Sequence, residues 1–181
     1  SSVDVDLIVN AAVIPTQALI EAVLKLQVGE ELFYTDKWLA RKGSVVQKTI
    51  IFKSDLIILE NRWDIFQKNG EVLKADYALI TQGRISLPLS KTNTVIGESN
   101  LIFLEEGAKC EASILNTTNG PIYIGKNAEI MEGSIVRGPL ALCESAGLKL
   151  GTKVYGPTTL GPHCKVGGEV NNVVFQSYSN K

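Results

Sequence analysis

The sequence predicts a mainly β protein in which short strands stack as a coiled solenoid, preceded by a small α/β segment. Three observations lead to this prediction: a six-residue aliphatic repeat, turn-forming residues between the repeats, and an amphipathic helix pattern near the N-terminus. One repeat cannot bury its apolar side chains alone, so the repeats must stack on one another. We therefore expect residues 1–84 to form the α/β segment and residues 85–181 to form the solenoid.

The N-terminal segment begins with a strand pattern over residues 5–13. An amphipathic helix is predicted after Pro15, because Leu19, Val23 and Leu26 recur at helical spacing. Gly29 is a plausible stop for this helix. Residues 31–60 are predicted to be extended, with strands at 32–34, 45–46 and 56–59.

Two short helices are expected next. Asn61 is a candidate N-cap for a helix over residues 62–68 that ends at Asn69-Gly70, because Asn and Gly favour helix ends. A second helix is predicted over residues 71–81, with Gly83 after it. Residues 84–95 then form a crossover into the solenoid.

The repeat itself is regular over residues 124–166. Every sixth residue is aliphatic, and the position two residues before the next aliphatic one is mostly small. A spacing of two places both side chains on one side of a strand, so both are predicted to be buried. Lys126, Lys153 and Lys165 are predicted to be exposed. The inward positions are Ile124, Ala128, Ile130, Ser134, Val136, Leu140, Leu142, Ala146, Leu148, Thr152, Val154, Thr158, Leu160, Cys164 and Val166.

The repeat is less regular at its two ends. It begins weakly at Ile96, and the interval between Cys110 and Ile124 is two residues longer than two units. We place the extra pair in the turn-rich residues 116–121. The pattern loosens after Val170, although residues 173–175 are predicted to form a strand. We expect the chain to be a middle segment of a longer protein, with the solenoid incomplete at its C-terminal end.

Composition excludes several classes of function. The net charge is −1 and no cluster of Lys and Arg occurs, so binding to nucleic acid is not expected. No apolar stretch is long enough to span a membrane. Cys110 and Cys164 occupy inward positions, which predicts buried reduced thiols and a cytoplasmic protein.

The repeat resembles the hexapeptide-repeat family, in which a glycine often follows the aliphatic residue, as Gly125, Gly161 and Gly167 do here. The resemblance implies a left-handed parallel β-helix of triangular section with three units per coil. It also implies a homotrimer. Outward apolar residues at Met131, Ile135, Ala141 and Tyr155 agree with such an assembly, since a solvated monomer has no need of them.

Longer motifs resemble the sugar-phosphate nucleotidyltransferases of the glucose-1-phosphate thymidylyltransferase type, which are similar to the bifunctional N-acetylglucosamine-1-phosphate uridylyltransferase. Residues 120–125, 156–162 and 165–170 look like the C-terminal arm of that family, and residues 5–41 and 62–66 look like its α/β catalytic domain. The resemblance implies that a nucleoside triphosphate and a sugar-1-phosphate are converted to a nucleotide-sugar and pyrophosphate. It leaves the nucleotide and the sugar open.

The family's Gly-rich phosphate loop is expected to precede residue 1. Such a loop binds phosphates through backbone N–H groups. No Gly-x-Gly-x-x-Gly stretch occurs in these 181 residues. We therefore expect the 181 residues alone to be inactive, although the complete enzyme would be a nucleotidyltransferase.

Asp64 is the one candidate metal ligand. Related enzymes carry a Trp-x-Asp element that holds Mg²⁺ beside the sugar phosphate, and Trp63-Asp64 resembles it, although the two residues are adjacent here. Mg²⁺ is therefore expected in the complete enzyme and no cofactor in these residues alone. The alternative is an Asp in the first turn of a helix, where the helix dipole favours it.

His163 is the only histidine and an unlikely catalytic base, since it lies in the predicted corner 161–163. A single histidine cannot supply the three zinc ligands of hexapeptide carbonic anhydrases. Two alternatives to the nucleotidyltransferase stay open. One is a hexapeptide acyltransferase that uses acyl-CoA, and the other is a non-catalytic trimerisation arm.

Overall fold

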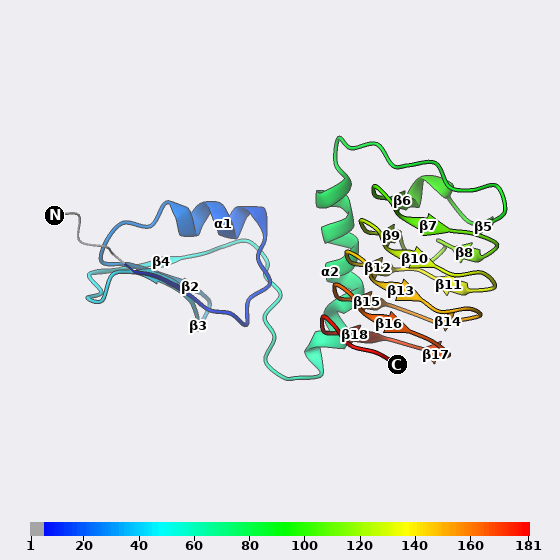
Figure 1. The fold of residues 1–181 in the computed structure, drawn as a ribbon. Helices are drawn as coiled ribbons and strands as arrows, with labels where there is room; N and C mark the ends of the chain where they lie inside the picture. The colour runs from blue at the N-terminus through cyan, green and yellow to red at the C-terminus, as the bar shows by residue number, and fades with distance from the viewer. Residues whose placement is uncertain (1–5) are drawn as a thin grey trace. The chain divides into compact units, whose positions relative to one another are not determined.

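The computed structural model describes residues 6–181 and contains two compact units, Ser1–Arg62 and Trp63–Lys181 (Figure 1). Val5, the first residue of the predicted N-terminal strand, lies outside the described residues. The units divide at residue 62, not at the predicted boundary of residue 84. The reason is that the long helix preceding residue 84 contacts strands of the C-terminal unit.

The N-terminal unit is a four-stranded sheet with one helix. Its sheet has the order β1-β3-β2-β4, in which only the β2–β4 pair is parallel. Thr16 caps the helix through its side chain, which accepts a hydrogen bond from the Leu19 N–H at 3.2 Å. The elements are β1 (Leu7–Val9), α1 (Gln17–Leu24), β2 (Glu30–Tyr34), β3 (Lys37–Lys42) and β4 (Lys48–Ile51).

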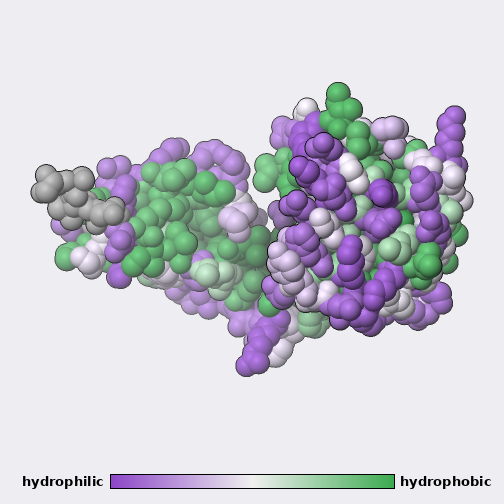
Figure 2. All heavy atoms as spheres, in the orientation of Figure 1, coloured by the Kyte–Doolittle hydropathy of each residue, from purple (hydrophilic) through white to green (hydrophobic). Residues whose placement is uncertain are grey.

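Two strand predictions in this unit were wrong. Residues 45–46 lie in the connection before β4, and residues 56–59 form only an isolated bridge between Ile58 and Val13. Exposed apolar side chains of this unit include Leu24, Val28 and Val45, and Figure 2 shows hydrophobic residues gathered over its visible face. In the described chain, from residue 6 onward, no helix is long and apolar enough to cross a membrane.

Helix α2 (Asp64–Thr81) opens the C-terminal unit as one continuous helix, so the predicted break at Asn69-Gly70 was wrong. Its N-cap is Trp63, not the predicted Asn61. Asn69 and Gly70 face a neighbour. Asn69 is only 9% exposed, and a Cβ on Gly70 would lie 2.8 Å from Pro157 Cγ. The glycine therefore permits close packing and does not end the helix.

The remainder of the unit consists of three parallel sheets wound one above another. Their orders are β16-β13-β10-β7, β17-β14-β11-β8-β5 and β18-β15-β12-β9-β6. The elements are β5 (Thr94–Ile96), η1 (Ser99–Leu101), β6 (Ile102–Leu104), β7 (Lys109–Cys110), β8 (Ile114–Asn116), β9 (Ile122–Ile124), β10 (Glu129–Ile130), β11 (Ile135–Arg137), β12 (Leu140–Leu142), β13 (Gly147–Leu148), β14 (Lys153–Val154), β15 (Thr158–Leu160), β16 (Lys165–Val166), β17 (Glu169–Val170) and β18 (Val173–Phe175). This arrangement is β-helix-like.

All fifteen predicted inward positions from Ile124 to Val166 are buried, at 2% exposure or less. The three lysines predicted to face outward are exposed. Cys110 and Cys164 are buried free thiols, as predicted, and Cys143 is half-buried. The core is therefore a column of stacked aliphatic and small side chains, which no single coil could bury by itself.

The ends of the repeat differ from its middle. Val95 packs against the core and Ile96 is 46% exposed, so the inward series begins one residue earlier than predicted. Ile122 and Ile124 pair with Ile102 and Leu104, 20 residues earlier (124 − 104), which places extra residues in the preceding corner as expected. The last coil is shorter, because Val154 pairs with Val170, 16 residues later (170 − 154).

Helix α2 covers the outer face of the sheet formed by β6, β9, β12, β15 and β18 (Figure 1). Strand pairing aligns one outward residue from each strand in a ladder of Phe103, Tyr123, Ala141, Thr159 and Val174. Phe103 is only 5% exposed even though it points away from the interior of the coil. This sheet therefore carries side chains on both faces, and the space under α2 contains one cavity and borders another.

Candidate functional site

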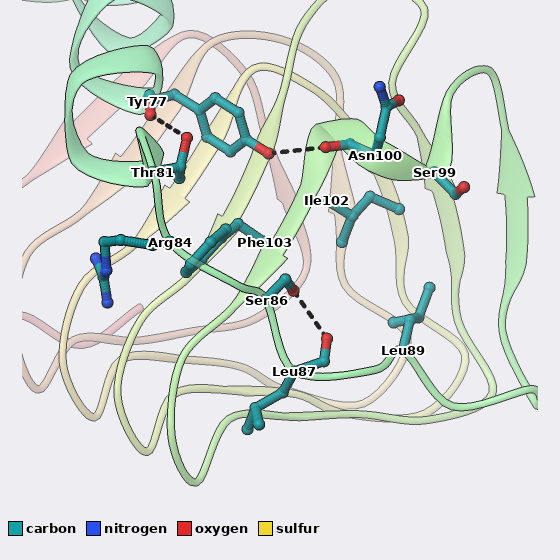
Figure 3. A pocket seen from close by; sticks show the side chains of 10 residues that line it. All are labelled: Tyr77, Thr81, Arg84, Ser86, Leu87, Leu89, Ser99, Asn100, Ile102 and Phe103. Carbon is teal, nitrogen blue, oxygen red and sulfur yellow. Dashed lines mark hydrogen bonds between the residues drawn. The ribbon is translucent and has the colours of Figure 1, made fainter.

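The largest described cavity, which we call the first-coil cavity, lies beside the C-terminal end of α2 (Figure 3). Its volume is about 600 Å³. Helix α2, the crossover after it and the first coil all contribute to its wall. The lining residues are Tyr77, Thr81, Arg84, Ser86, Leu87, Leu89, Ser99, Asn100, Ile102 and Phe103.

Hydrogen bonds hold the three parts of this wall together. The Tyr77 hydroxyl donates to the backbone oxygen of Asn100 at 3.3 Å, which connects α2 to the first coil. The Ser86 hydroxyl donates to the Leu87 carbonyl at 2.8 Å and accepts from the Leu104 N–H at 2.9 Å. The crossover is thereby fixed along β6, and the cavity has a rigid, hydroxyl-rich wall (Figure 3).

Arg84 provides the positive charge at this cavity. Its Nη2 donates to Glu105 Oε2 at 2.6 Å, and its guanidinium lies 5.2 Å from the centre of the Phe103 ring. The Tyr123 hydroxyl donates to Glu105 Oε1 at 2.7 Å. The hydrogen bond from Arg84 lowers the pKa of Glu105, and burial raises the pKa of Tyr123 to about 12. Arg84 therefore stays charged, but its charge is balanced by Glu105.

A second cavity, which we call the helix cavity, lies between α2 and the outward ladder of the sheet. Its volume is about 210 Å³, and most of its surface is apolar. The Thr159 hydroxyl donates to Asn69 Oδ1 at 2.8 Å across it. It is lined by Asn69, Val72, Leu73, Asp76, Tyr77, Ile80, Tyr123, Ala141, Cys143 and Thr159.

Asp64, the candidate magnesium ligand, lies half-buried in the first turn of α2. Thirteen residues of helix separate it from Tyr77, about 20 Å along the axis at 1.5 Å per residue. Asp64 therefore lies far from the first-coil cavity. Among residues 6–181, no three His, Cys, Asp or Glu side chains gather as a metal-binding group. Asp64 could supply one ligand there, with phosphate or water oxygens completing the shell.

His163 lies at a corner of the β-helix, as expected, in a left-handed conformation with φ of +61°. It is exposed, and its ring stacks on Tyr178 with 4.8 Å between centres. It lines neither of the two cavities. The geometry gives no substrate for it to deprotonate.

One stretch needs separate mention, because residues 120–126 have the spacing Gly-x-x-x-x-Gly-Lys of a phosphate loop. The resemblance ends there. Asn127 stands where the motif requires Ser or Thr. Ile122 and Ile124 are fully buried in strand β9, so this backbone forms a coil of the β-helix and not a loop around phosphate.

Sequence reasoning did not identify Tyr77, Arg84, Glu105 and Tyr123 as a connected group. They come from α2, the crossover and two successive coils, so only the stacking of the coils brings them together. Two signals were available. Tyr123 and Phe103 are bulky aromatic residues at outward positions, where a solvated strand usually carries polar side chains, and so they indicate a covered face.

Comparison with known proteins gives one finding on function. Residues 1–85 match a family described as sugar nucleotidyl transferase. No curated protein matches the chain. The matched residues contain the whole N-terminal unit, helix α2 and Arg84. The match supports a protein of the nucleotidyltransferase type with a general transferase role, joined to a β-helix-like arm.

Proposed function

We propose that this chain is part of a cytoplasmic sugar-1-phosphate nucleotidyltransferase. The family match over residues 1–85 is the observation that carries the proposal. In this reaction an oxygen of the sugar phosphate attacks the α-phosphorus of a nucleoside triphosphate. The bond from the α-phosphorus to the bridging oxygen breaks, and pyrophosphate leaves. The products are a nucleotide-sugar and pyrophosphate.

The position of α2 supports a β-helix that belongs to the same enzyme. The family match runs through α2 and ends at residue 85, so the matched sequence includes the helix that packs on the β-helix. We further propose that the arm is a left-handed hexapeptide β-helix. Its central strands support this, since partners lie 18 residues apart (Ile130 with Leu148, Val136 with Val154), the length of three six-residue units.

Magnesium is part of the proposal, with Asp64 as the residue that would hold it. A bound Mg²⁺ would neutralise charge on the phosphate oxygens. Asp64 would contribute a single carboxylate, because no cluster of potential ligands surrounds it within residues 6–181. The phosphates also need backbone N–H donors from a Gly-rich loop, which these 181 residues do not contain.

The test is pyrophosphate release by the complete reading frame in which these residues occur. Each nucleoside triphosphate is combined with each of several sugar-1-phosphates, with Mg²⁺ or with excess chelator. We expect release for one combination with Mg²⁺, and no release by the 181 residues alone. Asp64→Asn is expected to reduce release at least tenfold, while Asp55→Asn, an exposed control, leaves it unchanged. Absence of release from the complete protein for every combination contradicts the proposal.

A second role is supported by an exposed apolar strip on one sheet of the arm. Ile114 and Ile135 are paired neighbours on β8 and β11, and they are 37% and 42% exposed. Tyr155, at a corner nearby in sequence, is 50% exposed. Ala141 does not belong to this strip, because it lines the helix cavity. We propose that the strip joins three copies of the chain in a homotrimer, since a closed ring buries equivalent faces.

A further inference from the structure

The helix cavity has the size of a small ligand site and lies entirely within the C-terminal unit. A buried apolar cavity of about 150 Å³ accepts benzene. At about 210 Å³ the helix cavity has room for one ring with a small substituent. Val72, Leu73 and Ile80 from α2 and Ala141 from the sheet form its apolar walls.

Asn69 brings an unpaired polar group to this apolar space. The side chain is 91% buried (100 − 9), and its Nδ2 atom is buried without a hydrogen-bond partner. The Thr159 hydroxyl occupies only the other end of the amide. Turning the amide over would pair Nδ2 with Thr159 and leave Oδ1 unpaired, so either orientation leaves one amide atom to be satisfied. A buried unpaired amide costs free energy that an apolar residue would avoid.

The other polar groups of the lining are already engaged. The Tyr77 hydroxyl donates to the Asn100 carbonyl, and the Tyr123 hydroxyl donates to Glu105. The described lining contains no Lys or Arg, and it contains the acid Asp76. An anionic ligand would meet this carboxylate with no cation to balance it. The lining therefore suits an uncharged molecule that forms one strong hydrogen bond, to Asn69.

We propose that the helix cavity binds a small, uncharged, mainly apolar molecule, about one ring in size, whose carbonyl oxygen accepts a hydrogen bond from the Asn69 amide. The site is separate from the proposed nucleotidyltransferase chemistry. A ligand there would contact α2 and two or more coils at once. It would therefore stabilise the packing of α2 on the β-helix.

Cys143 provides a direct readout of occupancy. It lines the cavity and is half-buried, whereas Cys110 and Cys164 are buried in the coil interior. Burial raises the pKa of the Cys143 thiol, so alkylation with N-ethylmaleimide is followed at mildly alkaline pH by mass spectrometry of the intact chain. The two probes are acetophenone and α-methylstyrene, which have the same shape and differ in having a C=O or a C=CH₂ group.

We expect acetophenone to slow alkylation of Cys143 in a saturable way, with a roughly three- to tenfold lower half-saturating concentration than α-methylstyrene, the range that one hydrogen bond gives. Asn69→Leu should remove this difference, while Lys68→Leu, an exposed change on the same helix, should preserve it. Ala141→Val, which fills the cavity from the sheet, should weaken both probes.

Several outcomes overturn the proposal. No protection of wild-type Cys143 by either probe shows that the cavity does not take such molecules. Equal protection by both probes shows that Asn69 does not recognise the oxygen. A crystal structure with an ordered water bonded to Asn69, together with no protection, assigns the cavity to solvent. None of these outcomes depends on pyrophosphate release, so the inference and the proposed function fail independently.

Discussion

Gly70 provides the sharpest test of how α2 packs on the β-helix. An alanine Cβ at this position would lie 2.8 Å from Pro157 Cγ and 3.2 Å from Pro157 Cβ. In an exposed helix Gly→Ala stabilises by about 1 kcal/mol, whereas an extra carbon in a tightly packed contact costs about 1–3 kcal/mol. We therefore expect Gly70→Ala to destabilise the C-terminal unit by about 1 kcal/mol.

A Pro157→Ala background reverses the sign of this effect. Without Cγ the closest remaining contact would be the Cβ at 3.2 Å, which is tight but adjustable. Gly70→Ala should then stabilise by up to about 1 kcal/mol, and the double-mutant cycle should give a coupling of about 1–2 kcal/mol. The effect of Pro157→Ala on the unfolded chain cancels in the cycle.

The assay is pulse alkylation of Cys164 across a urea series, because this buried thiol reacts only when the C-terminal unit opens. It reports on that unit without interference from the N-terminal one. A Gly70→Ala variant that is more stable than wild type, with zero coupling to Pro157, would refute the packing described above. It would mean that α2 lies farther from the β-helix.

Three further predictions use the same chain. Val154→Asp should destabilise the β-helix by ~3–5 kcal/mol in urea unfolding, since it buries an unpaired carboxylate, while the exposed Leu150→Asp should change stability by less than about 0.5 kcal/mol. Arg84 lowers the pKa of Glu105, so the stability that Glu105 contributes is present above its ordinary pKa of 4.5 and is lost as pH falls below it; Glu105→Gln should flatten this acid limb of the urea midpoint against pH, and an unchanged limb contradicts the pairing. Ile135→Arg should convert the proposed trimer to monomer in sedimentation, and a wild-type monomer in the complete protein would rule the trimer out.

The β-helix-like core could be predicted because its signal is repeated. Each inward position from Ile124 to Val166 is constrained twice, by its own strand and by the coils above and below it, so errors at one position do not propagate. The first and last coils lack one of these neighbours. Their lengths change by two residues at the corners, and Val95 replaces Ile96 as the inward residue.

Helix α2 and both cavities could not be predicted in this way. Asn69-Gly70 has the local chemistry of a helix end, yet tertiary packing against Pro157 and Thr159 decides its structure. The polar network of Arg84, Glu105 and Tyr123 spans three elements that are distant in sequence. Such contacts follow from which sheet the helix covers, and no periodicity in the sequence encodes that choice.

The most direct test of the proposed function follows oxygen atoms through the reaction. The complete reading frame is supplied with a sugar-1-phosphate whose phosphate carries a heavy oxygen isotope, together with Mg²⁺ and the active nucleoside triphosphate. If the sugar phosphate attacks the α-phosphorus, mass spectrometry should find all of the label in the nucleotide-sugar and none in the pyrophosphate. Failure to form a nucleotide-sugar, or label released as inorganic phosphate, would contradict the assignment of this chain to a sugar-1-phosphate nucleotidyltransferase.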